Sequence, residues 1–149
     1  MKKFTFRLQV VLDMRNKTLE DKRLQMAKVI KRLNLLNETL EELKGNQEKL
    51  TNELNAIYET NKIDIGAIQT YKDYISKLYN DIRIQEKNIS DWNKILYVKQ
   101  KEVSEALKQV KILEKLKEKE EKKFKDHINY LEEKEADDMA TTRYKANFN

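Results

Sequence analysis

The side chains of this chain that could carry chemistry are one histidine and pairs of carboxylates at helical spacing. His127 stands next to Asp126, and Glu114 and Glu118 are four residues apart. One histidine with one carboxylate is a poor metal site, so we predict a packed or half-exposed structural role for His127. Charged pairs at this spacing are usually the solvated face of a helix, which is also our interpretation of the glutamates.

Sequence motifs of catalysis are absent from the chain. It contains no G-x-x-x-x-G-K-[ST] loop, no G-x-G-x-x-G turn and no H-E-x-x-H helix. It has no cysteine, so it can form neither a disulfide nor a thiolate metal site, which fits a reducing compartment. We therefore predict that the protein is not an enzyme and that it binds no cofactor and no metal.

The composition favours long helices over a compact fold. Of the 149 residues 38% are charged, with no proline and only two glycines, and compact domains build their turns largely from these residues. The net charge of +5 comes from 31 basic and 26 acidic side chains. This balance is too mixed for a polycation, so it permits nucleic-acid binding without suggesting it.

Two long segments carry an apolar residue at alternating steps of three and four, the pattern of a coiled-coil seam. The first seam comprises Leu8, Leu12, Arg15, Leu19, Lys22, Met26, Val29, Leu33, Leu36, Leu40, Leu43, Gln47, Leu50, Leu54 and Ile57. The second comprises Ile75, Leu78, Ile82, Gln85, Ile89, Trp92, Leu96, Lys99, Val103, Ala106, Val110, Leu113, Lys117, Glu120, Phe124, His127 and Leu131. A helix with a half-polar stripe of this kind needs a partner helix, and each segment provides one for the other.

The pattern fails between Ile57 and Tyr71, where Gly66 and the potential caps Asn61 and Asp64 indicate a turn. We predict an all-α fold, a long antiparallel two-helix coiled-coil hairpin. Its expected parts are a first helix at about 4–60, a turn at about 61–67, a second helix at about 68–139 and a frayed tail at 140–149. At about 1.5 Å per residue the second helix is longer and should overhang the first.

Charge supports the antiparallel direction. Residues 1–32 hold ten basic side chains against three acidic ones, whereas residues 132–138 hold five acidic against one basic. Antiparallel folding brings these segments together. No signal peptide and no window of about 20 apolar residues is present, so we expect a soluble, cytoplasmic protein without membrane insertion.

Aromatic residues gather at both ends of the expected hairpin. Tyr58, Tyr71, Tyr74 and Tyr79 flank the turn; tyrosine is common at interfaces, but packing of the hairpin end explains these residues equally well. At the start of the chain, Phe4 and Phe6 precede the seam. They either fasten the open end of the hairpin to the second helix or form an exposed docking edge.

The motif Phe4-x-Phe6-x-Leu8-x-x-Val11-Leu12-x-x-Arg15 resembles the opening of the FliJ family, coiled-coil proteins of flagellar type III export. The resemblance continues through Ile68-x-x-Tyr71-x-x-Tyr74-Ile75 and through Ala106-x-x-x-x-Lys111-x-Leu113-Glu114-Lys115-Leu116-Lys117 with Phe124. It covers nearly the whole chain in the right order, although residues 141–149 have no counterpart that we can place.

The resemblance implies a component of the export apparatus that supports motility. Its partners would be the export ATPase ring, the cytoplasmic domain of the membrane export gate and export chaperones, at the inner face of the cell membrane. The ATPase would supply the energy, and this chain would transmit it as a stalk. The residues implied for the ATPase end are Phe4, Phe6, Arg7, Leu8, Arg15, Lys115, Lys117 and Phe124, and those for the gate end are Leu54, Tyr58, Tyr71, Tyr74 and Leu78.

Two other interpretations remain open at this point. A generic coiled-coil scaffold or tether would associate with itself along the seam. A basic helical protein that lies on nucleic acid or on a membrane surface would bind less tightly as salt is added. Such a protein should have a continuous basic face, and residues 38–64 are net acidic.

Overall fold

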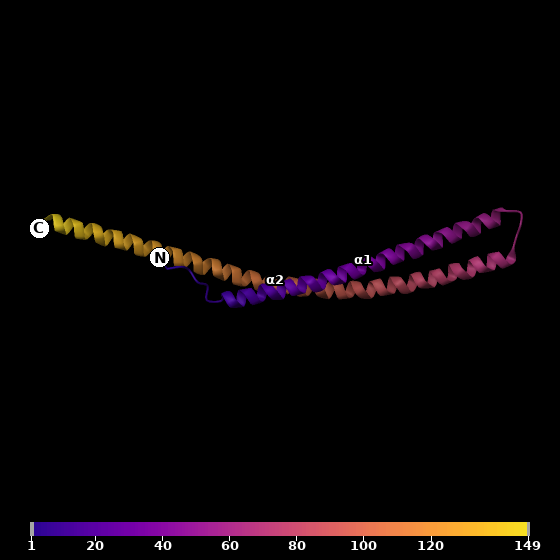
Figure 1. The fold of residues 1–149 in the computed structure, drawn as a ribbon, viewed down its shortest axis with the longest axis horizontal. Helices are drawn as coiled ribbons and strands as arrows, with labels where there is room; N and C mark the ends of the chain where they lie inside the picture. The colour runs from indigo at the N-terminus through magenta and orange to yellow at the C-terminus, as the bar shows by residue number, and fades with distance from the viewer. Residues whose placement is uncertain (1, 149) are drawn as a thin grey trace. The chain divides into compact units, whose positions relative to one another are not determined.

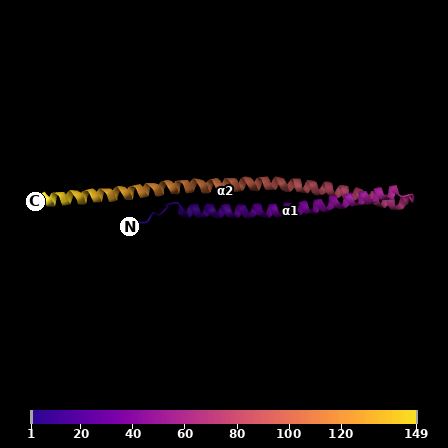
Figure 2. The same ribbon diagram turned by 90° about the horizontal axis from the view of Figure 1, so that it is seen from above.

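The computed structural model describes residues 2–148 and contains two helices, α1 (Gln9–Glu59) and α2 (Ile65–Phe148). These account for all the regular secondary structure of the described residues. The two helices lie against each other (Figures 1 and 2), which confirms the predicted all-α hairpin. By its contacts the chain divides into unit 1, Met1–Asp21 with Ser104–Asn149, and unit 2, Lys22–Val103.

Contacts between the helices within each unit are antiparallel. In unit 2, Gln85 of α2 donates to the carbonyl of Leu36 at 2.9 Å, while Lys99, further along α2, reaches back to Gln25 at 3.1 Å. In unit 1, Lys117 donates to Gln9 at 2.9 Å. Within each unit, residues further along α2 therefore meet earlier residues of α1, as expected for an antiparallel hairpin.

The core of both units is the predicted seam. Apart from Phe6, every buried apolar residue of the described chain occupies a seam position. These residues are Leu12, Leu19, Val29, Leu33, Leu40 and Leu54 of α1, and Leu78, Ile82, Ala106 and Val110 of α2. The last two seam positions, His127 and Leu131, are exposed instead, because residues 2–8 are not helical and no turn of α1 lies against them.

Several polar seam positions have partners on the facing helix or segment. Besides the bonds of Gln85 and Lys117, Glu120 pairs with Arg7 at 3.8 Å. Lys22 of α1 pairs with Glu102 of α2 at 3.4 Å, and Glu102 also meets Lys99 at 3.5 Å. Partly exposed pairs of this kind contribute little to stability. They give Lys22, Lys99 and Glu120 a partner of opposite charge in or beside the seam.

The turn is shorter than the sequence predicted because Asp64 caps α2. Its carboxylate accepts the backbone N–H of Ala67 at 3.2 Å, which is the bond of an N-cap residue to the third helical position. Helix α2 consequently starts at Ile65, not near residue 68. At the other side of the turn the Thr60 hydroxyl donates to the carbonyl of Ile57 at 2.7 Å, where α1 ends.

The N-terminal segment differs from the prediction of a helix from about residue 4. Residues 2–8 form no helix, and the backbone N–H of Gln9 bonds to the carbonyl of Phe6 at 3.1 Å in a turn. In an extended segment Phe4 and Phe6, two residues apart, point to the same side, whereas in a helix they would diverge. The non-helical start therefore lets both rings lie against α2.

The C-terminal segment also differs, because α2 continues to Phe148 where the sequence predicted fraying after Met139. No proline or glycine follows Gly66 to interrupt the helix. The hydroxyls of Thr141 and Thr142 bond to the carbonyls four residues earlier, at 2.9 Å each. Local helical hydrogen bonding thus extends through residues that lack a seam; Asn149 of the predicted tail lies outside the described residues.

Replacing Leu33 by Ala should destabilise the hairpin by about 2 kcal/mol or more, because its side chain is buried between the helices. Leu35 on the same helix is 52% exposed, so Leu35→Ala is the matched control and should change stability by less than about 0.5 kcal/mol. Urea denaturation followed by far-ultraviolet circular dichroism measures both. Equal losses in the two variants would contradict the seam.

Replacing Gly45 by Ala should stabilise the protein by about 0.5–1 kcal/mol, since glycine is an unfavourable residue inside a helix. An added Cβ at Gly45 would have no heavy atom within 4 Å. The glycine is therefore not needed for a close approach of α2. Gly66→Ala is the control, because its Cβ would lie 3.4 Å from the capping carboxylate of Asp64. A thermal melt that shows destabilisation by Gly45→Ala would refute this account.

Candidate partner-binding surfaces

The histidine and the acidic side chains of the described residues do not gather into a metal-binding group. Among residues 2–148 no group of three histidine, cysteine or acidic side chains is placed to hold a metal ion. His127 is exposed, so of the two alternatives predicted for it the packed one is wrong. In the same residues neither helix has a stretch apolar enough to cross a bilayer. The surfaces that remain are those that other proteins could contact.

The aromatic residues of the open end in unit 1 are used for internal packing. Phe6 is 4% exposed. The ring of Phe4 lies 5.7 Å from the ring of Phe124 at an interplanar angle of 48°, a favourable tilted aromatic pair. Of the two alternatives for these phenylalanines, the structure therefore supports the one in which they fasten the N-terminal segment to α2. Phe4, Phe6, Leu8 and Phe124 are at least partly buried and stabilise this end.

Basic residues of the same end point into solvent. Arg7, Arg15 and Lys115 are exposed, whereas Lys117 is half-buried by its bond to Gln9. Arg15 and Lys115 form no ion pair with any residue between 2 and 148. Of the residues expected at the ATPase end, these cations are the ones that a partner could reach without disrupting the hairpin.

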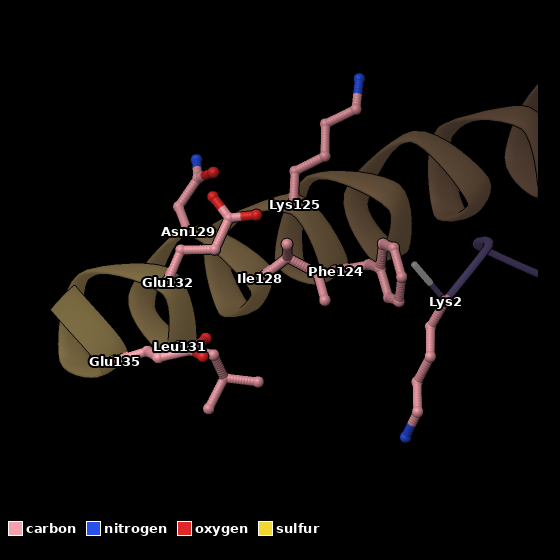
Figure 3. Close-up of a pocket in the computed structure, with 8 residues that line it drawn as sticks. All are labelled: Lys2, Phe124, Lys125, Ile128, Asn129, Leu131, Glu132 and Glu135. Carbon is pink, nitrogen blue, oxygen red and sulfur yellow. The ribbon is translucent and has the colours of Figure 1, made fainter. Parts of the chain in front are cut away.

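In unit 1 a groove lies on the surface of α2 beside Lys2 of the non-helical N-terminal segment. Its volume is about 440 Å³, and it is lined by Lys2, Phe124, Lys125, Ile128, Asn129, Leu131, Glu132 and Glu135. Figure 3 shows Lys2 beside the ring of Phe124, with Ile128 on the next turn of α2. Of these lining residues, only Phe124 was expected from the sequence to be a site residue. The seam pattern does not indicate where the N-terminal segment lies against α2.

Beyond this groove α2 is exposed on every side over residues 131–147. Figure 2 shows α2 continuing past the N-terminal segment. Leu131 is 44% exposed and Met139 is 54% exposed. This overhang has no helix lying against it within unit 1, so its apolar side chains are available to a partner.

The turn end of unit 2 divides its expected residues between core and surface. Leu54 and Leu78 are buried in the seam, and Tyr71 is half-buried. Tyr58 and Tyr74 are 50% and 51% exposed. Only the two exposed tyrosines present a large aromatic surface to a partner, while the two leucines hold the scaffold that carries them.

The turn exposes two further residues that were not expected from the sequence. Ile63 and Ile65 are 70% and 78% exposed, among the highest values for any large apolar side chain of the described chain. They fall outside both seams, which is the signal that could have identified them as surface residues. With Tyr58, Tyr74 and Tyr79 they are the large apolar and aromatic residues exposed on the two helices near the turn, and we call this set the turn patch.

Tyr71 contacts a carboxylate at this end of the hairpin, and the contact shifts its pKa. Its hydroxyl donates to Glu53 at 3.1 Å. This hydrogen bond raises the pKa of Tyr71 above its ordinary value, and the negative charge of Glu53 adds to the effect. The bond stabilises the fold fully below the unfolded pKa of about 10 and is lost as the pH rises through the raised folded pKa.

Two long helices packed against each other along a shared apolar seam define the class of coiled-coil hairpin proteins. The chain matches the family model described as "Flagellar FliJ protein" over residues 3–148. It belongs to that family, and its role is related to flagellar export. The match includes residues 141–148, for which the sequence analysis placed no counterpart. Searches of curated proteins and of solved structures returned no match.

Replacing Glu53 by Gln should lower the pKa of Tyr71, because the neutral amide no longer opposes formation of the phenolate. The phenolate absorbance in an alkaline titration measures this shift, and subtracting the titration of a Tyr71→Phe variant isolates Tyr71 from the other tyrosines. Glu59→Gln, a change of the same kind near the turn, is the control and should leave Tyr71 unchanged. An unaltered titration in Glu53→Gln would disprove the contact.

Proposed function

We propose that this protein is a non-enzymatic stalk of the flagellar type III export apparatus. In this proposal it couples the export ATPase ring to the cytoplasmic domain of the membrane export gate, and it also escorts export chaperones. It works in the cytoplasm, peripheral at the inner face of the cell membrane. Family membership supports a role in export, and the different chemistry of the two ends supports two different partners.

The observation that carries this proposal is the distribution of exposed residues. In unit 1 the hairpin presents the unpaired cations Arg15 and Lys115, and, further along α2, a groove and an unpartnered stretch of helix. In unit 2 it presents the turn patch, which is apolar and aromatic. A cationic surface favours an acidic partner and fast association, whereas exposed tyrosines are typical of interface anchors. A single partner surface would not complement both the cations of unit 1 and the turn patch of unit 2.

A stalk of this kind has no chemistry of its own. Any energy comes from hydrolysis in the ATPase, and the stalk acts by binding one partner conformation more tightly than another. The continuous hydrogen bonding of α1 and α2 suits such a role, because a helix without proline kinks transmits displacement better than a loop does. Neither a generic tether nor a nucleic-acid binder explains why the ends differ.

The experiment is a pull-down of purified export ATPase and of the gate's cytoplasmic domain with two double variants. Arg15→Glu/Lys115→Glu should weaken ATPase binding about tenfold and leave gate binding unchanged, because it reverses charge at the open end only. Tyr58→Ala/Tyr74→Ala should weaken gate binding about tenfold and leave ATPase binding unchanged. All four side chains are exposed, so circular dichroism should show folded hairpins.

Each double variant serves as the control for the other. If neither variant changes either affinity, the assignment of the ends is wrong, although the fold is unaffected. If wild-type protein captures neither partner but associates with itself, the tether interpretation replaces the stalk. Substitution of Phe4 or Phe6 is a poor test of binding, because both rings lie against α2 and their loss would disturb the end itself.

A further inference from the structure

Unit 2 contains a groove between α1 and α2 that belongs to neither end of the hairpin. Its volume is about 490 Å³. It is lined by Gln25, Lys28, Val29 and Arg32 of α1 and by Trp92 and Lys99 of α2. No carboxylate is among these residues, although more than a third of the sequence is charged and acidic residues are nearly as frequent as basic ones. We call it the Trp92 groove.

The floor of the Trp92 groove is apolar and its rim is cationic. Val29 is buried, and Trp92 is half-buried. The guanidinium carbon of Arg32 lies 5.7 Å from the centroid of the Trp92 ring, a cation–π arrangement that holds the guanidinium above the ring. The N–H groups of Arg32 make no hydrogen bond or ion pair with any residue between 2 and 148. They therefore remain available as donors.

The helices around the groove carry a large excess of positive charge. Residues 22–32 and 92–103 hold eight cations and one anion: Lys22, Arg23, Lys28, Lys31, Arg32, Lys94, Lys99 and Lys101 against Glu102. Glu102 pairs with Lys22 and Lys99. Lys28, like Arg32, has no acidic partner in the described chain. Glu102 thus neutralises Lys22 and Lys99 in the seam. The positive charges of Lys28 and Arg32 at the rim of the groove stay uncompensated.

The spacing of the two rim cations indicates the shape of the ligand. Lys28 and Arg32 are four residues apart on α1, which places their side chains about 6 Å apart on one helical face. Two carboxylates one turn apart on a second helix have the same spacing. A bulky apolar side chain on the same face of that helix would reach the floor formed by Val29 and Trp92.

We propose that the Trp92 groove binds an acidic amphipathic helix of a partner protein. Two carboxylates of that helix, one turn apart, pair with Lys28 and Arg32, and an apolar side chain between them packs on Trp92. This site is separate from the ends assigned above and stands whether or not those assignments hold. It gives the hairpin a lateral binding site in addition to its two ends.

Charge along α1 favours a short acidic segment over a long polyanion. Beyond Arg32 the exposed surface turns acidic, with Glu38, Glu41 and Glu42 within three turns. A nucleic-acid backbone that continued along the helix would meet these carboxylates. A flat membrane surface would leave the hollow unfilled. An acidic helix of three or four turns matches the length of the basic region and fills the groove.

Trp92 is the only tryptophan of the chain, so its fluorescence reports on the groove directly. The probe is a synthetic four-turn helical peptide with blocked ends, containing two glutamates one turn apart and a leucine on the same face. Saturable change of Trp92 emission is expected. Replacing both glutamates of the peptide by glutamine should weaken binding at least tenfold, and replacing its leucine by alanine about threefold or more.

Protein variants test which cations act. Lys28→Gln/Arg32→Gln should weaken binding of the acidic peptide at least tenfold. The matched control is Lys87→Gln/Arg83→Gln, which removes the same two residue types at the same spacing from exposed positions of the same unit. It should change the affinity less than twofold. Equal losses in both double variants would show that net charge alone attracts the peptide, and would overturn the proposal.

Three further outcomes also overturn the proposal. The first is that the acidic peptide causes no change of Trp92 emission. The others are that anionic phosphatidylglycerol vesicles, or single-stranded DNA, cause a larger change than the acidic peptide does. Sedimentation at the same protein concentrations detects self-association of the chain. If a second copy binds the groove through its own Glu38 and Glu42, that copy replaces the partner helix as the occupant. If the Lys28→Gln/Arg32→Gln variant fails to fold, the peptide series with wild-type protein decides the question.

Discussion

Burial of one apolar stripe against another is the constraint on which this structure depends. Neither helix has an interior of its own, and a single helix in water gains little stability without packing. The buried residues come from both α1 and α2 along the seam, and every one but Phe6 lies in it. Losing the seam would therefore remove the scaffold of both ends and of the groove at once.

The seam also decides which residues are free to bind. At the open end Phe4, Phe6 and Phe124 are used for internal contacts, so recognition there depends on cations, the groove and the overhang. At the turn the seam uses Leu54 and Leu78 and leaves tyrosines and isoleucines outside. At the end of unit 2 away from the turn, Glu102 neutralises Lys22 and Lys99, while Lys28 and Arg32 stay unpaired.

Periodicity predicted the fold because both helices repeat their apolar residues at alternating steps of three and four. A stripe with this spacing is buried by another helix of the same kind. It did not predict the helix ends, which depend on local bonds: the cap of Asp64, the turn at Phe6 and the threonine bonds after Met139. Residue type suggested aromatic contact sites, but type alone does not separate a buried phenylalanine from an exposed tyrosine. The Trp92 groove was not predicted because it combines residues far apart in sequence.

The overhang of α2 has a consequence for how firmly a partner can hold it. From Leu131 onward its backbone is held by hydrogen bonds within its own turns, and no neighbouring helix in unit 1 protects it. A helix without tertiary packing is less stable against local opening than one in the seam, and a ligand that docks on it must hold it in the helical state. The entropy lost in doing so lowers affinity and favours quick release, so the overhang suits brief, repeated encounters better than permanent attachment.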